Sequence, residues 1–156
     1  MNFENNNPLL DLSDLPRWAD IQPEHVAFAM QTTLTRVREA MDTVVRLDEQ
    51  AVNWDNFVEY LNDAIEALSR VWGVVTHLHH VVDNEQWRAA YNEFLPQVIE
   101  FCTELGQNET LLAHYQALAK EPMFSSLTPT RQRIVTNALR DFALSGALLK
   151  GEARAE

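Results

Sequence analysis

The sequence contains little cysteine, glycine or lysine. Its 156 residues include one cysteine, four glycines and two lysines. A single cysteine, Cys102, excludes an intramolecular disulfide, and we interpret it as a small apolar residue on the buried side of its helix. Four glycines are too few for the loops that cradle phosphates or dinucleotides. These absences argue against enzymes that bind phosphates or dinucleotides through glycine-rich loops, and they exclude domains stabilised by an intramolecular disulfide.

The sequence also lacks a long hydrophobic run and a cluster of positive charge. No apolar stretch approaches the 18 or so residues that suggest a membrane span, and the residues at 1–7 are polar rather than leader-like. A formal net charge of −11 repels phosphate backbones and anionic membranes. We therefore expect neither nucleic acid nor a membrane as partner, and we expect a cytoplasmic location.

What is present is the apolar spacing of four and three residues that is typical of amphipathic helices. The longest such pattern predicts a helix from Trp54 to Val82, with Asn53 as its N-cap. A parallel row that includes Trp72 and His79 widens the apolar face, so this helix needs more than one partner. The main apolar stripe consists of Phe57, Leu61, Ala64, Leu68, Val71, Val75, Leu78 and Val82.

Similar patterns predict four further helices. They span residues 23–47, 85–105, 108–121 and 128–146. In the second of these, Pro96 predicts a kink near residues 92–96 and Gly106 predicts the end. We expect Asp83 and Asn84 to end the central helix and to offer the N-cap of the third, with Gln86 placed to close a capping box on Asp83. Residues 123–127 are expected to form a turn.

The sequence thus predicts an all-α fold, an antiparallel up-down-up bundle of three long helices with two shorter C-terminal helices packed on it. Residues 1–22 are expected to form an extended lead-in packed on the bundle. Residues 23–147 form one helical domain, and residues 148–156 start an interrupted helix or a linker.

Three histidines near the end of the central helix raise the question of a metal site. His77 and His80 share a helix face, and Glu85 or Glu104 could add a carboxylate. A zinc site needs three or four converging ligands, however, and no Glu-x-x-His or His-Glu-x-x-His run is present. We therefore favour packing and surface roles, with His79 in an interface and one of its ring nitrogens hydrogen-bonded. No catalytic, cofactor-binding or metal-binding residue is assigned.

Several segments together resemble a known family. They are Asn7-Pro8-Leu9-Leu10, Ile21-Gln22-Pro23-Glu24-His25-Val26, Thr76-His77-Leu78, Leu95-Pro96, Asn137-Ala138-Leu139-Arg140-Asp141-Phe142 and Leu144-Ser145-Gly146. Their order is similar to the N-terminal region of oligopeptidase A-like members of the thimet oligopeptidase and neurolysin family of zinc metallopeptidases. The resemblance extends from about residue 7 to residue 149.

The resemblance implies a non-catalytic N-terminal helical domain of a longer zinc metalloendopeptidase. Such enzymes degrade short peptides in a channel between two helical halves, and this domain would form part of the channel wall. The family's zinc is held by His-Glu-x-x-His and a downstream Glu, a motif absent here, so zinc would belong to the catalytic body that is this chain's partner. The alternative is a free-standing helical interaction module without the chemistry, and a weaker one is a metal-binding bundle through His77, His79 and His80.

Overall fold

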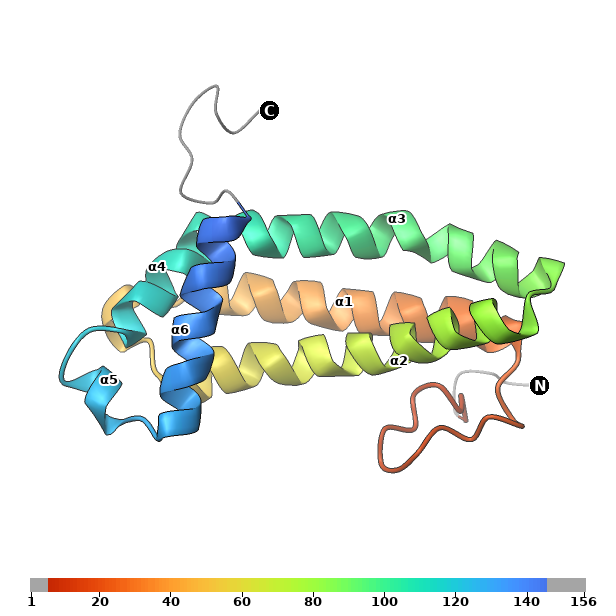
Figure 1. The fold of residues 1–156 in the computed structure, drawn as a ribbon, viewed down its shortest axis with the longest axis horizontal. Helices are drawn as coiled ribbons and strands as arrows, with labels where there is room; N and C mark the ends of the chain where they lie inside the picture. The colour runs from red at the N-terminus through yellow and green to blue at the C-terminus, as the bar shows by residue number, and fades with distance from the viewer. Residues whose placement is uncertain (1–5, 146–156) are drawn as a thin grey trace, which may run out of the picture. The chain divides into compact units, whose positions relative to one another are not determined.

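The computed structural model describes residues 6–145, and all regular secondary structure within that range is helical (Figure 1). The predicted all-α class is confirmed. No helix in this part of the chain is long and apolar enough to cross a membrane. The expectations for residues 146–156 lie outside the described residues. The α-helices are α1 (Val26–Val45), α2 (Tyr60–Val82), α3 (Glu85–Gln107), α4 (Glu109–Leu118), α5 (Met123–Ser126) and α6 (Pro129–Leu144).

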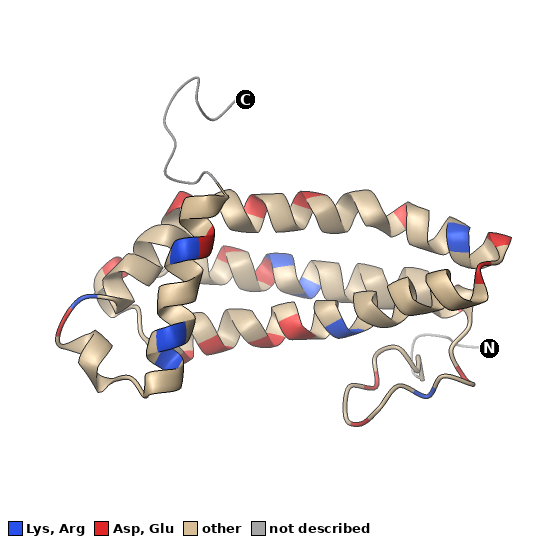
Figure 2. Ribbon diagram, viewed as in Figure 1, with Lys and Arg blue, Asp and Glu red and all other residues tan. Residues whose placement is uncertain are grey.

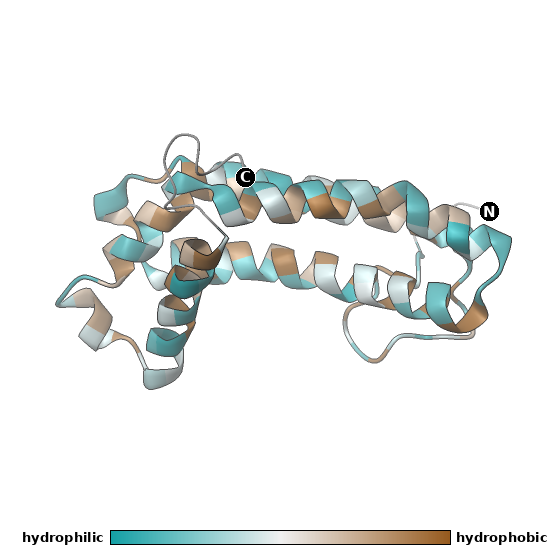
Figure 3. Ribbon diagram, turned by 45° about the horizontal axis from the view of Figure 1, so that its top comes forward, coloured by the Kyte–Doolittle hydropathy of each residue, from teal (hydrophilic) through white to brown (hydrophobic). Residues whose placement is uncertain are grey.

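The chain divides into two compact units. Among the described residues, unit 1 comprises 6–40 together with Leu61–Glu100, and unit 2 comprises Met41–Tyr60 together with 101–145. Hydrophobic and hydrophilic residues alternate along the long helices (Figure 3), as expected for amphipathic helices. Acidic residues occur on α1, α2 and α3 with arginines between them (Figure 2), so no long helix presents an uninterrupted basic face.

The core of unit 1 is built from the predicted helical stripes. Buried side chains come from α1 at positions 26, 30 and 37, from α2 at positions 61–78 and from α3 at positions 87, 94 and 98. Arg38 on α1 also pairs with Glu100 on α3 at 3.3 Å. Burial of these large apolar side chains removes the most hydrophobic surface from water and is the main stabilising contribution.

The core of unit 2 is organised around Phe57. Its ring lies edge-on to Tyr115 and His114 of α4, with centroid distances of 4.7 and 5.4 Å. His114 Nε2 donates to the Val44 carbonyl at 3.0 Å, which satisfies an acceptor in the last turn of α1. α4 packs on α6, where Tyr115 meets Phe142.

The structure corrects the start of the predicted central helix and confirms its end at Val82. Residues Trp54–Glu59 form a π-helical segment, and α2 begins only at Tyr60. Asn53 is the N-cap as predicted and accepts from the backbone N–H groups of Asp55 and Asn56. Val82, the last residue of the predicted stripe, is 47% exposed. The rest of the stripe, from Phe57 to Leu78, is buried.

The turn between α2 and α3 also differs from the prediction. Asp83 has a positive φ of 44°, a left-handed conformation that ends α2 and that Asp tolerates better than most residues. The cap of α3 is therefore Asn84, whose Oδ1 accepts from the Trp87 N–H at 2.9 Å. The predicted capping box on Asp83 is wrong because an N-cap needs an extended backbone.

Three predictions farther along the chain are also wrong. α3 continues past Gly106 to Gln107, and the Ser145 hydroxyl donates to the Gly106 carbonyl at 2.5 Å. Residues 123–126 form the short helix α5 rather than a turn, and Gln132 donates to the Phe124 carbonyl. Cys102 is exposed, since it lies about 100° around the helix from buried Phe101.

Candidate binding site between the lead-in and α2

The three histidines do not converge on one point. His77 lies against the ring of Trp18 at 5.1 Å, and His80 Nδ1 donates to the Thr76 carbonyl at 2.7 Å. His79 stacks on Tyr91 at 4.2 Å with an interplanar angle of 7°. Within residues 6–145, no group of three or more His, Cys, Asp or Glu side chains could hold a metal.

His79 packs in the interface with α3, as predicted. Its buried Nδ1 has no hydrogen-bond partner among the described residues. The ring of Tyr91 also stacks on Trp72, with ring centroids 4.9 Å apart and an interplanar angle of 13°. Trp72 and His79 are seven residues, or about two helical turns, apart on α2. Tyr91 of α3 is therefore held between them, and the histidine serves packing.

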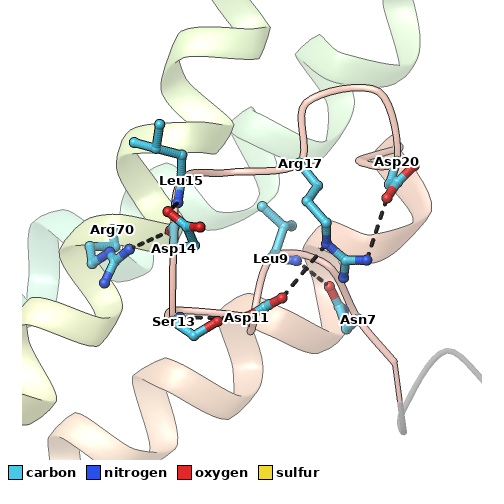
Figure 4. Close-up of polar contacts among 9 residues, drawn as sticks. All are labelled: Asn7, Leu9, Asp11, Ser13, Asp14, Leu15, Arg17, Asp20 and Arg70. Atoms are coloured by element: carbon cyan, nitrogen blue, oxygen red, sulfur yellow. Dashed lines mark hydrogen bonds and ion pairs between the residues drawn. The ribbon is translucent and has the colours of Figure 1, made fainter.

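Polar side chains of the lead-in, residues 7–22, fix its irregular backbone (Figure 4). Buried Asn7 accepts from the Leu9 N–H at 3.0 Å and donates to the His25 carbonyl at 2.8 Å. Asp11 accepts from the hydroxyl of Ser13 at 2.6 Å and from its N–H. Arg17 lies 3.6 Å from Asp11 and 3.5 Å from Asp20. The segment is thus held in one conformation without regular secondary structure.

The hydrogen bonds from Ser13 also set the charge state of Asp11. They stabilise its carboxylate form and, with smaller contributions from Arg17 and Arg70, lower its pKa below the usual value. Asp11 consequently remains ionised at any pH near neutrality. Asp14 accepts the N–H of Leu15 at 2.8 Å and forms no ion pair within residues 6–145.

Arg70 connects the lead-in to α2. Its Nη1 donates to the Leu12 carbonyl at 2.6 Å and its Nη2 to the Asp14 carbonyl at 2.9 Å. Figure 4 shows the guanidinium reaching from α2 to the lead-in backbone. A planar guanidinium suits this pair of acceptors because its donors are fixed in a fork. One side chain therefore positions the central part of the lead-in.

A cavity of about 200 Å³ lies between the lead-in and α2. Trp18 and the aspartates Asp11 and Asp14 lie at it, and Gly73 contributes bare backbone. A Cβ placed on Gly73 would meet no heavy atom within 4 Å, so this glycine leaves space beside α2. The apolar part of the lining comes from Pro8, Leu9, Leu12, Pro16, Ile21 and Val74.

Sequence reasoning missed this site. The lead-in has no periodicity, so the positions of Asp14 and Trp18 cannot be inferred from spacing. Two signals were available: Arg70 directly precedes Val71 of the apolar stripe, and Gly73 is the one glycine in that helix. Both mark a place where another segment contacts α2 or where space is left beside it.

Comparison with known proteins gives consistent matches over most of the chain. A family model described as "Neurolysin/Thimet oligopeptidase, N-terminal domain" matches residues 30–154. Oligopeptidase A of Escherichia coli is 36% identical over 146 residues, and that of Haemophilus influenzae is 33% identical over 147 residues; each alignment covers 94% of this chain. The probable cytosolic oligopeptidase A of Arabidopsis thaliana is 31% identical over 151 residues, 97% of this chain. The chain spans 21% of the length of each of these relatives.

Proposed function

The chain belongs to the neurolysin/thimet oligopeptidase N-terminal domain family, and we propose that it is a non-catalytic helical domain of an oligopeptidase A-like zinc metalloendopeptidase that degrades short peptides. The observation that carries the proposal is the alignment with oligopeptidase A of E. coli, which covers 94% of this chain but only 21% of that relative's length. In this proposal the partner is the catalytic body of the peptidase, and short peptides are the substrates of the whole enzyme.

Zinc belongs to the catalytic body in this proposal. Within residues 6–145 the histidines do not fit the metal, because the rings of His77 and His79 each contact a different aromatic side chain and His80 is bonded to its own helix. A catalytic zinc needs three protein ligands around one point, and the sequence contains no His-Glu-x-x-His. We therefore derive no catalytic step from these residues.

We further propose that residues 23–147 act as one domain in which α1, α2 and α3 run up, down and up, and that they form part of the substrate-channel wall. Two residues, Asp83 and Asn84, separate α2 from α3, and short connections favour antiparallel neighbours. Long amphipathic helices also suit a channel wall, because one face packs against the protein and the other is exposed to solvent. A cytoplasmic location completes the proposal, supported by the cytosolic name of one relative.

A chimera tests the domain role. The segment of E. coli oligopeptidase A that matches this chain would be replaced by it, and hydrolysis of a fluorogenic peptide would be measured with and without a zinc chelator. We expect chelator-sensitive activity well above that of the E. coli body lacking the segment. A chimera that is folded, contains zinc and is no more active than the body alone would refute the proposal.

The second candidate, a free-standing interaction module, is favoured by exposed apolar side chains. Leu15 is 81% exposed, Val81 61% and Leu144 78%, and large exposed apolar groups occur at interaction surfaces. Sedimentation of the chain should then reveal self-association at micromolar concentration, abolished by Val81→Glu or Leu144→Glu. A monomer at all concentrations would exclude self-association as the role of these residues.

A further inference from the structure

We propose that the cavity between the lead-in and α2, which we call the lead-in pocket, binds a peptide segment that carries one bulky apolar side chain beside one positively charged side chain. This inference goes beyond the proposed function, and its test does not use peptidase activity. It concerns only residues of unit 1.

The size and lining of the lead-in pocket fit a single large apolar side chain. An apolar cavity of about 150 Å³ is known to accommodate benzene, and the lead-in pocket measures about 200 Å³. Its walls include Leu12, Ile21 and Val74, and Gly73 presents no side chain to fill it. A Leu or Phe side chain entering this partly open pocket would therefore lose part of its contact with water, which is favourable.

The charges around the lead-in pocket favour a cation beside that apolar group. Asp11 and Asp14 lie at the pocket, and Arg70 is the basic residue there. Arg70 keeps its positive charge, because both of its terminal nitrogens donate to neutral backbone carbonyls, but the two carboxylates at the pocket outnumber it. Arg17 is shared between Asp11 and Asp20. The Asp14 carboxylate has no ion-pair partner within the described range, so a Lys or Arg of the bound segment would complement it.

The rim of the lead-in pocket has the character of a binding surface. Trp18, which lines the pocket, is 46% exposed, although it belongs to a segment held by Asn7, Asp11 and Arg70. Tryptophan is enriched among the residues that dominate binding energy. Because the segment is already ordered by these contacts, little conformational freedom would be lost on binding.

The test is an NMR titration of the isotope-labelled 156-residue chain with acetyl-Gly-Arg-Leu-Gly-amide. We expect saturable shifts at the Trp18 indole N–H and the Gly73 amide, with a Kd near or below about 1 mM, as expected for one buried side chain and one exposed ion pair. Peptides with Ala in place of Leu, or Glu in place of Arg, should bind measurably more weakly. A Glu peptide that binds as well as the Arg peptide would overturn the proposal.

Gly73→Leu provides the decisive variant because it fills the lead-in pocket without removing a contact. It also replaces a helical glycine, so it should not weaken α2. Binding should weaken at least about tenfold, the loss expected when one large apolar side chain can no longer be buried. Asn62→Leu, at an exposed position on the same helix, is the matched control and should bind as the wild type does. Folded Gly73→Leu with unchanged affinity would contradict the proposal.

Asp14→Asn tests the charge separately. The amide oxygen can still accept the Leu15 N–H, so the turn is preserved, while the negative charge is lost. We expect affinity for the Arg peptide to fall about two- to fivefold, as for an exposed ion pair, and affinity for a Gln-Leu peptide to stay unchanged. Equal effects on both peptides would show that Asp14 acts through structure and not through charge, and would overturn the ionic part of the proposal.

Discussion

Replacing Arg70 by Met should release the lead-in from α2 while leaving the helix intact. Methionine retains an apolar stem but removes the donors to the Leu12 and Asp14 carbonyls, which lie at 2.6 and 2.9 Å. A hydrogen bond with one charged partner contributes about 1.5–3 kcal/mol. One of these bonds is part-buried and the other exposed, so we take the low end and expect a total loss of about 2–3 kcal/mol.

This loss should appear as faster local opening of the lead-in. The Leu10 N–H donates to the backbone carbonyl of Asn7, and the Trp18 N–H donates to the backbone carbonyl of Pro16. These two amides lie on either side, in sequence, of the residues that contact Arg70. At about 1.4 kcal/mol per factor of ten, their hydrogen exchange should accelerate about 30- to 160-fold in Arg70→Met. Amide exchange followed by NMR under conditions of rapid reclosing is the assay, and the Val75 amide in α2 is the internal reference.

Arg70→Lys supplies the intermediate case. An ammonium group carries the same charge but lacks the fixed fork of donors, so it should replace one carbonyl contact and lose the other. We expect an acceleration between those of the wild type and Arg70→Met. If the Leu10 and Trp18 amides in Arg70→Met accelerate less than about threefold, Arg70 does not hold the lead-in and the preorganised pocket loses its support.

Three further predictions concern unit 2. Burial raises the pKa of Tyr115 to about 12, against about 10 in an unfolded chain; the folded protein therefore keeps a proton that the unfolded chain releases, and stability falls as pH rises above 10. Between pH 9 and pH 11 this costs about 1.4 kcal/mol, so Tyr115→Phe should lose about that much less in urea unfolding, and equal losses in both proteins would contradict the cause. Asn53→Ala should lower stability by about 1 kcal/mol by removing the N-cap, whereas Asn53→Asp should retain most of it in the same unfolding assay; equal losses would argue against the cap. Lys120→Ala breaks an exposed pair with Glu49 and should change the unfolding free energy by less than about 1 kcal/mol, so a larger effect would show that the pair is not a simple surface contact.

The long helices were predictable because their apolar residues repeat with the period of an α-helix. Burial of the stripe from Phe57 to Leu78 follows directly from that spacing. Where two neighbouring residues could both cap a helix, the spacing of apolar residues did not show which of them does. Asp83 and Asn84 are both good capping residues, and only the left-handed backbone at Asp83 shows that Asn84 caps α3.

The parts that were mispredicted depend on contacts between distant residues. α5 is held by Gln132 from the following helix, a contact that no local pattern contains. The exposure of Cys102 depends on which face of α3 has a partner, and its neighbour Phe101 faces the core instead. The lead-in pocket depends on Arg70, whose acceptors are 56 and 58 residues earlier in the chain.

The central claim is that this chain contributes helical structure to a peptidase and not its metal chemistry. The most direct measurement is the zinc content of the purified chain after equilibrium dialysis against zinc, combined with hydrolysis of a fluorogenic peptide by the same sample. The account predicts zinc well below one ion per chain and no chelator-sensitive hydrolysis, because the three histidines do not supply converging ligands. Stoichiometric, tightly bound zinc with hydrolysis that a chelator abolishes would contradict it.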